Sequence, residues 1–357
     1  MPDRPLEELR GKVGESRETV VDLVVEAGKV DEFARAIRAD NPAHRDETAA
    51  RDQGFEAIPA PLTFTRTSYF ERYRPDGVDE HLGFDLGLDP RYLVHGEQEY
   101  EYERPVTVGD TLAGTTSLTD VSQREGGRGG TLTFVVFKTA FHDEGGDLVL
   151  TERNTRIETE SAIDDGNEST EAAEGSASNE SDDSDASAVG EDGESTRGAK
   201  EGPPRESRTP LSAEDVAVGD EGPTVVAEDV DREDFVRYAG ASGDFYRIHY
   251  DEPYARAAGN PSVFGQGMLT AGFASHMVAD WFGLENVRRF RTRFESRLWP
   301  NTTVTVTGTV TDKRPVEYHD QRTAADSLVD VEFSAIADDG EVLLTGDATA
   351  GLPAGDG

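Results

Sequence analysis

The chain has 357 residues, which is too many for one small core and enough for two domains of ordinary size. Its formal net charge of -38 would repel a nucleic-acid backbone or an anionic membrane, so neither is expected as a partner. Cys is absent, which excludes disulfides, thiolate metal sites and a Cys nucleophile.

The composition also bears on where the protein works. Only 5 of the 35 basic residues are Lys, and this bias toward Arg, together with the acidic excess, favours a halophilic cytosol. The start, MPDRPLEELRGK, lacks the apolar core of a signal peptide, and no apolar run approaches the roughly 20 residues needed to cross a bilayer. We therefore expect a soluble, cytoplasmic protein.

Residues 1–160 form the first expected folded unit. The unit opens on a short helical pattern in VDEFARAIRADNPAH and closes on alternating, β-branched runs that are typical of antiparallel strands. Between them, TSYFERYRPDGVDEHLGFDLG begins like a helix but is broken by Pro75 and Gly77. The expected strands are HGEQEYEYERPV, DTLAGTTSLTDVSQ, GTLTFVVFKTAFHD and DLVLTERNTRIE.

A change of composition separates this unit from the rest of the chain. Residues 161–210 contain 14 Asp or Glu and no aromatic residue. Such a stretch buries too little apolar surface to offset the entropy lost on ordering. We predict a disordered acidic linker that serves as a solvated spacer, with an interaction tail as the alternative.

Residues 211–357 form the second expected unit. A short helix follows Asp231, a plausible N-cap with Asp234 at the third helical position. A longer helix, GQGMLTAGFASHMVADWFG, has large apolar residues every four positions and small residues elsewhere, so a sheet can wrap closely around it. The pattern predicts an α+β fold, one helix against a curved antiparallel sheet. The expected strands are RRFRTRFESRLW, TTVTVTGTVTDKR, SLVDVEFSAIAD and EVLLTGDATAGL.

The two units repeat the same order of elements. Phe33 aligns with Phe235, and His44, Asp46 and Glu47 align with His249, Asp251 and Glu252, with the first copy three residues shorter between Phe and His. The first copy has Ala39, not an acid, five positions before its His. These observations suggest a gene duplication in which the N-terminal copy has degenerated.

The stretch SGDFYRIHYDE places Asp244 five positions before His249. A metal site is disfavoured because no second His lies nearby, and no G-x-S-x-G elbow of a serine hydrolase occurs. A lone Asp and His in a loop are often structural. Here, however, Gly267 is expected at the start of the long helix, where a free N–H and the helix dipole stabilise negative charge on a carbonyl oxygen. Acid, base and oxyanion donor are all available.

At these residues the sequence resembles the MaoC-like dehydratase family, the (R)-specific enoyl-thioester hydratases with a hot-dog fold. SGDFYRIHYDEPYARAAG followed by FGQGMLTAGF fits the family motif, with Tyr246, Arg247 and Gln266 as departures from it at the expected substrate pocket. Residues 1–160 resemble the companion hot-dog of fused members, which lacks the Asp–His pair. The motif matches are Gly243, Asp244, Ile248, His249 and Asp251.

The resemblance implies a double hot-dog, two antiparallel sheets each wrapped around a central helix that is short or broken in the N-terminal half. It implies a lyase of fatty acid metabolism that reversibly hydrates trans-2-enoyl thioesters to (R)-3-hydroxyacyl thioesters. Asp244 and His249 would share the acid and base roles, in an order left open, and Gly267 would hold the thioester carbonyl. The implied substrate-pocket residues are Tyr246, Arg247, Gln266 and Met268.

No metal or cofactor is implied beyond coenzyme A or an acyl-carrier thioester as the substrate carrier, and a homodimer of the double chain is compatible with the family. Arg288, Arg289 or Arg291 could hold carrier phosphates, although an Arg-rich strand end is more often a solvated edge.

Three alternative functions stay open. The first is a hydratase for a branched or dicarboxylic acyl-CoA, in which a distal carboxylate would pair with Arg247. The others are a hot-dog thioesterase and a non-catalytic module that binds acyl thioesters.

Overall fold

The computed structural model describes residues 4–78, 82–89, 92–126, 130–159, 211–316 and 325–355. The predicted linker, residues 161–210, lies outside these ranges. The described residues of both halves belong to one compact unit of the chain.

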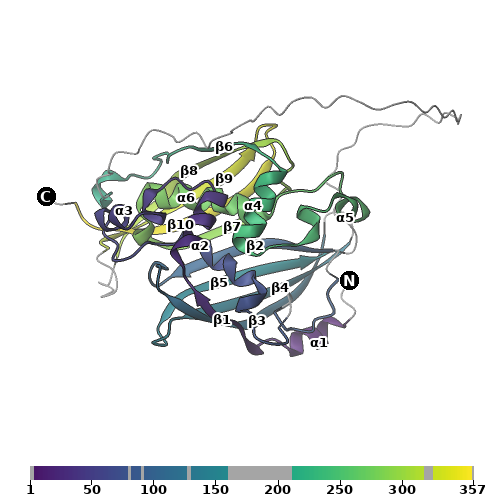
Figure 1. The fold of residues 1–357 in the computed structure, drawn as a ribbon. Helices are drawn as coiled ribbons and strands as arrows, with labels where there is room; N and C mark the ends of the chain where they lie inside the picture. The colour runs from purple at the N-terminus through teal and green to yellow at the C-terminus, as the bar shows by residue number, and fades with distance from the viewer. Residues whose placement is uncertain are drawn as a thin grey trace, which may run out of the picture. The chain divides into compact units, whose positions relative to one another are not determined.

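The N-terminal half contains four long strands that follow its helices in the chain (Figure 1). All four predicted strands are confirmed, as β2 to β5, and the stretch broken by Pro75 and Gly77 forms two short 3-10 helices in place of a long α-helix. The elements are α1 (Leu6–Gly11), β1 (Ser16–Val24), α2 (Ala27–Ala36), η1 (Pro42–His44), α3 (Glu47–Asp52), η2 (Phe64–Tyr69), η3 (Glu71–Tyr73), β2 (Leu93–Tyr102), β3 (Thr111–Glu125), β4 (Thr131–His142) and β5 (Leu148–Glu158).

The C-terminal half has the same order with a full central helix. The predicted cap is confirmed: the Asp231 side chain accepts from the N–H groups of Glu233 and Asp234, and the Asp234 carboxylate accepts from the Asp231 N–H. The elements are η5 (Ala213–Asp215), β6 (Val225–Val230), α4 (Arg232–Ser242), η6 (Arg247–His249), α5 (Glu252–Ala257), α6 (Gly267–Phe282), η7 (Leu284–Asn286), β7 (Val287–Phe294), β8 (Thr302–Pro315), β9 (Ser327–Ala337) and β10 (Val342–Leu352).

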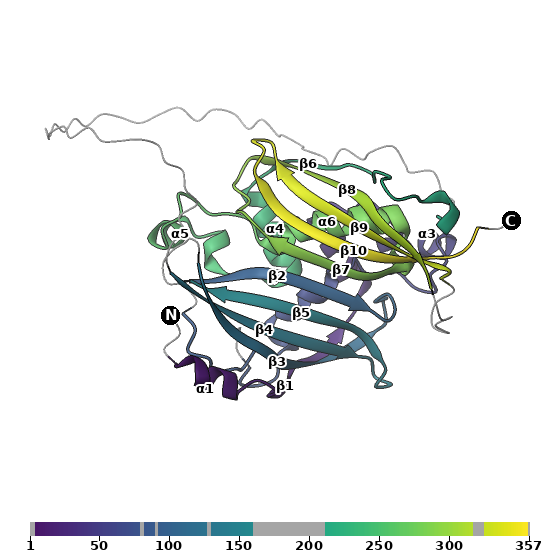
Figure 2. The same cartoon turned by 180° about the vertical axis from the view of Figure 1, so that it is seen from behind.

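The two predicted sheets are joined edge to edge into one antiparallel sheet of ten strands, in the order β1-β3-β4-β5-β2-β7-β10-β9-β8-β6. The junction is the pairing of β2 with β7, in which Gln98 lies opposite Thr292, and Figure 2 shows the strands running on from one half into the other. The α+β double hot-dog is therefore confirmed, with a continuous sheet that the sequence did not indicate.

Charged side chains cross the junction between β2 and β7. Arg289 pairs with Glu99 of β2 and with Asp347 of β10, and Arg291 Nη2 lies 3.1 Å from Glu97 Oε2. Both guanidiniums are thus held in cross-strand ion pairs, which does not support the idea that they hold carrier phosphates.

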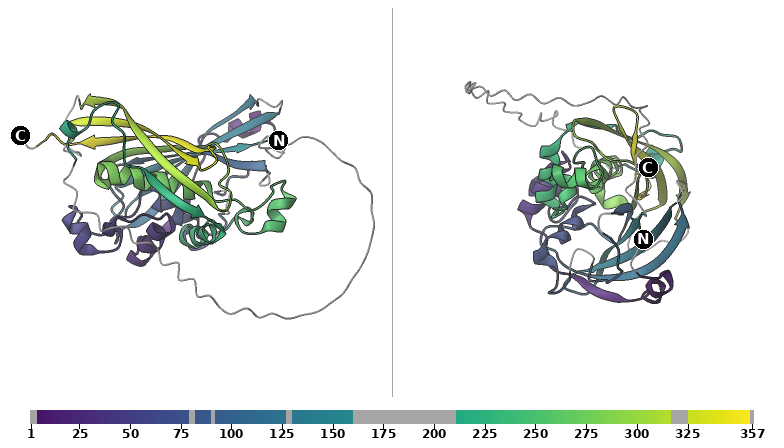
Figure 3. Two further views of the ribbon diagram at one scale, coloured as in Figure 1. Left: turned by 90° about the horizontal axis from the view of Figure 1, so that it is seen from above. Right: turned by 90° about the vertical axis from the view of Figure 1, so that its right-hand side faces the viewer.

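Helix α6 lies against β7 to β10 in the C-terminal half (Figure 3). Its small residues let neighbouring chain come close: a Cβ added at Gly272 would lie 2.4 Å from Ile37 Cγ2 of the N-terminal half. Among the described residues of the N-terminal half, no helix of comparable length occupies the corresponding part of the chain, which instead forms the short helices η2 and η3. The two halves therefore differ in the helix that follows the loop containing the His.

The repeat predicted from the sequence is visible as matching local structure. His44 and His249 each end a 3-10 helix, and Asp46 and Asp251 each cap the six-residue helix that follows. Arg38 and Gly243, six residues before these two His, both have positive φ, 55° and 82°. This match needs no gap, so the three-residue gap in the sequence alignment is wrong.

With the gap removed, Phe33 corresponds to Tyr238 and not to Phe235. The rings of Phe33 and Tyr238 pack together with centroids 5.9 Å apart. Equivalent residues of two related halves meet in this way where a pseudo-twofold axis passes between them. Ala39 remains the counterpart of Asp244, as the sequence indicates.

Candidate active site

His249 is held in one tautomer by a backbone carbonyl. Its Nδ1 lies 2.7 Å from the carbonyl oxygen of Phe264, and because that oxygen can only accept, Nδ1 carries the proton. Burial lowers the pKa of His249 and outweighs the opposing attraction of Asp244. The imidazole is therefore neutral near pH 7 and leaves the Nε2 lone pair to accept a proton.

Asp244 pairs with Arg66, a residue of η2 in the other half of the chain. Arg66 Nη2 lies 2.6 Å from Asp244 Oδ2, and the side chains are only 10% and 13% exposed. The Arg66 guanidinium also lies 3.5 Å from the ring centroid of Tyr69. Burial on its own would raise the pKa of Asp244, but the charge of Arg66 and the hydrogen bonds to the carboxylate outweigh it, so the pKa is lowered and Asp244 is ionised.

Gly267 is the first residue of α6, as predicted. The side chain of the N-cap residue Gln266 makes no capping hydrogen bond, so it does not occupy the N–H groups at the start of this 16-residue helix. A Cβ added at Gly267 would lie 2.9 Å from the ring of Phe294, so only Gly fits here. The residue type and the helix end both suit a donor to a carbonyl oxygen.

The other predicted pocket residues have different surroundings. The Tyr246 ring meets His249 edge to face at 6.2 Å, and its hydroxyl lies 3.1 Å from that of Tyr254. Buried Gln266 donates to the Phe235 carbonyl at 3.1 Å and to the Asp244 carbonyl at 3.4 Å, so it holds the loop that carries Asp244. Met268 is buried in the core.

The prediction that Arg247 belongs to the substrate pocket needs correction. Its side chain is 59% exposed, pairs with Asp251 at 2.5 Å and lies over the Tyr254 ring. The cause is local: Asp251 stands four residues later, beside the end of η6, and captures the guanidinium at the surface. Arg66 supplies the buried cation instead.

His95 of β2 also borders the site and was not predicted. Its ring packs on Phe294 at 4.7 Å, and its Nε2 lies 2.7 Å from Asn154 Nδ2 and 3.1 Å from Gln98 Oε1. Burial, aided by the charge of Arg66, lowers the pKa of His95 to about 3, so this imidazole is neutral. An irregularity in register between His95 and Glu97 interrupts the alternation of β2, so no local pattern marked His95 in the sequence.

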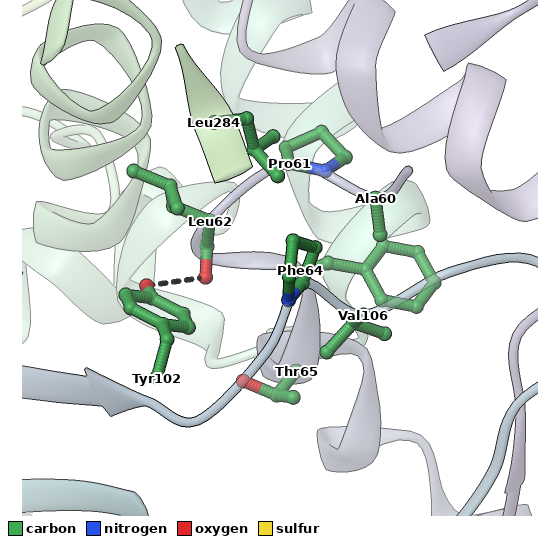
Figure 4. Close-up of a pocket in the computed structure, with 9 residues that line it drawn as sticks. Ala60, Pro61, Leu62, Phe64, Thr65, Tyr102, Val106 and Leu284 are labelled. Carbon is green, nitrogen blue, oxygen red and sulfur yellow. Dashed lines mark hydrogen bonds between the residues drawn. The ribbon is translucent and has the colours of Figure 1, made fainter. Parts of the chain in front are cut away.

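The N-terminal half retains one part of this arrangement. His44 Nδ1 lies 2.8 Å from the Pro59 carbonyl oxygen, the same contact at the same spacing as in the C-terminal half. Leu62 stands where Gly267 stands, and its carbonyl accepts from the Tyr102 hydroxyl at 2.8 Å (Figure 4). With Ala39 in the place of Asp244, this half has neither the acid nor the glycine. The small pocket beside Leu62 is lined by Ala60, Pro61, Leu62, Phe64, Thr65, Tyr102, Pro105, Val106 and Leu284.

Within the described ranges, no three His, Asp or Glu side chains come together in a way that could hold a metal ion. Across the same ranges, no helix is both long enough and apolar enough to span a membrane.

Gly243 sets the direction of the loop that carries Asp244 and His249, and we expect Gly243→Ala to destabilise the protein by about 1–3 kcal/mol. Its φ is 82°, and an added Cβ would lie 2.7 Å from the backbone nitrogen of Phe70 in the other half. Gly240→Ala in the same helix is the matched control, because φ is ordinary there and no atom lies within 4 Å of the added Cβ. Urea unfolding of both variants checks this; equal stabilities would contradict it.

Two stretches of the chain match described families. Residues 12–152 match the family described as FAS1-like, dehydratase domain region, and residues 213–332 match the one described as MaoC like domain. Among curated proteins, the chain is similar to the UPF0336 protein of Clavibacter michiganensis subsp. michiganensis, with 35% identity over 158 residues, 44% of this chain and 96% of the relative. A UPF0336 protein of Mycobacterium leprae is 36% identical over 119 residues, 33% of this chain and 66% of that relative.

Solved structures are similar over almost the whole chain. One described as a MaoC-like dehydratase has a TM-score of 0.69 and 24% identity, covering 97% of this chain and 100% of the other. A MaoC-like dehydratase from Phytophthora capsici has a TM-score of 0.61 and 17% identity, covering 96% and 98%. A conserved hypothetical protein from Mycobacterium tuberculosis, described as a double hotdog fold, has a TM-score of 0.59 and 13% identity, covering 98% of each chain. At these identities the likeness shows the fold.

Proposed function

Because the chain belongs to the MaoC-like dehydratase family, built as two hot-dog domains, we propose that it reversibly hydrates trans-2-enoyl thioesters to (R)-3-hydroxyacyl thioesters. The observation that supports this best is the pairing of an ionised carboxylate, Asp244, with a neutral imidazole, His249, whose Nε2 is free to accept a proton. Gly267 at the start of α6 supplies the third requirement, a donor for the carbonyl oxygen.

The ionisation states suggest how the proton moves. Asp244 has no proton to give, and the single proton of His249 is bound to the Phe264 carbonyl. The proton that reaches Cα must then come from the water itself. His249 Nε2 would remove it as the water oxygen attacks Cβ, and would then deliver it to Cα.

The remaining groups stabilise charge during this transfer. Asp244, held by Arg66, would orient the water and stabilise the imidazolium that forms for a moment on His249. The Gly267 N–H would hold the negative charge that develops on the thioester oxygen. Dehydration is the same path reversed, and coenzyme A or a carrier phosphopantetheine bears the acyl group throughout without any cofactor being consumed.

Hydration of crotonyl-CoA, followed by the loss of absorbance of the conjugated thioester, tests the proposal directly. We expect turnover and a product of R configuration, which chiral chromatography identifies. Binding of crotonyl-CoA without turnover would favour the non-catalytic module instead. Release of free coenzyme A without hydration would favour the thioesterase.

We also expect medium and long enoyl chains to be accepted. In the C-terminal half α6 fills the space inside the sheet, whereas the N-terminal half has the short η2 and η3 in the corresponding part of the chain. Steady-state kinetics on enoyl-CoA substrates from four to sixteen carbons measure this. Activity confined to the four-carbon substrate would show that packed loops close the N-terminal half to the acyl chain.

A further inference from the structure

The inner face of the N-terminal sheet is divided by polar side chains. One hydrophobic cluster includes Leu112, Phe141 and Leu150, and a separate one includes Leu118 and Phe137. These residues lie on the same face of β3, β4 and β5, so a single core would be expected there. Polar residues stand where the two clusters would otherwise meet.

These residues form two neighbouring rows across the strands. In the first row Thr116 lies opposite Thr139, Thr139 opposite Glu152, and Glu152 opposite Tyr100. In the second, Asn154 lies opposite Gln98, and Gln98 opposite Thr292 of the C-terminal half. We call the polar members of both rows the polar band: Gln98, Thr116, Thr139, Glu152, Asn154 and Thr292.

The polar band reaches the candidate active site at two points. Thr65, the neighbour of Arg66 in η2, donates its hydroxyl proton to Glu152. Asn154 contacts His95, whose ring packs on Phe294, the residue that also lies against Gly267. An acyl chain that enters the N-terminal half from a carbonyl at Gly267 would therefore run along polar groups.

Several buried polar atoms at this place have no hydrogen-bond partner among the described residues. They are Asn154 Oδ1, Arg66 Nε and the Tyr238 hydroxyl. Tyr238 is fully buried, and Arg66 and Asn154 are 9% exposed. Each unsatisfied group costs about 1–3 kcal/mol in an interior, so three at one place call for a partner that the described residues do not supply.

The charges around these unpartnered atoms limit the chemical class of a ligand that could bind them. The Arg66 cation is already neutralised by Asp244, and burial raises the pKa of Glu152, which disfavours added negative charge there. Donors and acceptors both occur among the unpartnered atoms, and a hydroxyl or carbonyl oxygen satisfies them without bringing a new charge.

We propose that the polar band binds an uncharged oxygen substituent, a hydroxyl or an oxo group, on the acyl chain of the substrate. This inference rests on the proposed function, because it assigns a substrate class to the same site. It distinguishes the protein from a hydratase whose acyl tunnel is lined by apolar groups alone.

The test compares trans-2-enoyl-CoA substrates of eight carbons that differ in one group on the distal half of the chain: hydrogen, hydroxyl, oxo or carboxylate. We expect kcat/KM for the best hydroxyl or oxo substrate to exceed that of the plain alkyl chain at least about tenfold, as one well-made hydrogen bond allows. A preference for the alkyl chain would overturn the inference while leaving the hydratase intact. A preference for the carboxylate would overturn the uncharged assignment.

Substitutions at the proposed site test whether the preference for oxygenated substrates arises there. Tyr238→Phe removes a hydroxyl that has no partner among the described residues, so folding should be preserved, and the ratio of kcat/KM between oxygenated and alkyl substrates should fall several-fold. Asn154→Leu should lower the same ratio further. Gln123→Leu is the control, since Gln123 Nε2 bonds Thr133 Oγ1 at 3.0 Å on the same sheet outside the polar band, and its ratio should not change. An unchanged ratio in both Tyr238→Phe and Asn154→Leu would refute the site; failure of every enoyl thioester to react would refute the proposed function itself.

Discussion

His249→Gln is expected to lower kcat for enoyl-CoA hydration by at least about a hundredfold, and Asp244→Asn by a similar factor, the usual scale of positioned acid–base catalysis. Gln keeps a donor for the Phe264 carbonyl but has no basic nitrogen to take a proton from water. Asn cannot stabilise an imidazolium. Single-turnover kinetics with crotonyl-CoA measure the loss, and circular dichroism verifies the fold.

His44→Gln is the matched control for His249→Gln. His44 is buried, ends the equivalent 3-10 helix and makes the equivalent bond to a backbone carbonyl, so the structural cost of the substitution is the same. Burial lowers its pKa to about 4, but Ala39 stands in the place of the acid. We expect turnover within about twofold of the parent. A loss comparable to that of His249→Gln would show that the N-terminal half takes part in the chemistry.

Arg66→Met is expected to destabilise the protein by about 3–5 kcal/mol near neutral pH, because it leaves the Asp244 carboxylate buried without a partner. The double variant Arg66→Met/Asp244→Asn should recover much of this loss. Arg72→Met is the control, since Arg72 is 55% exposed and reaches Glu26 only at 4.0 Å. Urea unfolding of the four proteins of this cycle measures the coupling; additive effects would show that the ion pair contributes nothing.

The same substitution should change the pH dependence with a defined sign. Arg66 helps to hold the folded pKa of Asp244 below the ordinary value, so the stability it contributes is present above the unfolded pKa of about 3.9 and is lost as pH falls through the folded pKa. Without Arg66, burial raises that pKa. The deficit of Arg66→Met should therefore be small in acid and grow toward neutral pH, while the acid limb of kcat/KM moves to higher pH. Parallel curves for variant and parent would contradict this.

The sequence predicted the elements whose patterns are local. The eight long strands alternate over ten residues or so, and the capping box of α4 lies within four residues, so both could be read directly. The edge strands β1 and β6 were missed. Asp22 and Asp229 interrupt them with positive φ, 47° and 46°, at irregularities in register that disturb the alternation.

The site was predicted in the same uneven way. Asp244, His249 and Gly267 lie close in the chain, and a motif covers them. Arg66 joins them only through the packing of the two halves, 178 residues away, which no local pattern reveals. The error on Arg247 has the opposite cause, because nearness in sequence was taken for nearness to the pocket, although the spacing of four to Asp251 already indicated a surface ion pair.

Because both halves are joined through β2 and β7 in a single chain, the two halves need not keep identical sequences. In a dimer of identical subunits, any substitution occurs in both copies of the site. An Asp therefore cannot be replaced by Ala in one site and kept in the other. Here Ala39 and Asp244, or Leu62 and Gly267, occupy equivalent places and have diverged independently. The N-terminal half now supplies Arg66 as the counter-ion of Asp244 and packs beside the candidate site of the C-terminal half. Two identical copies could not divide these roles between them.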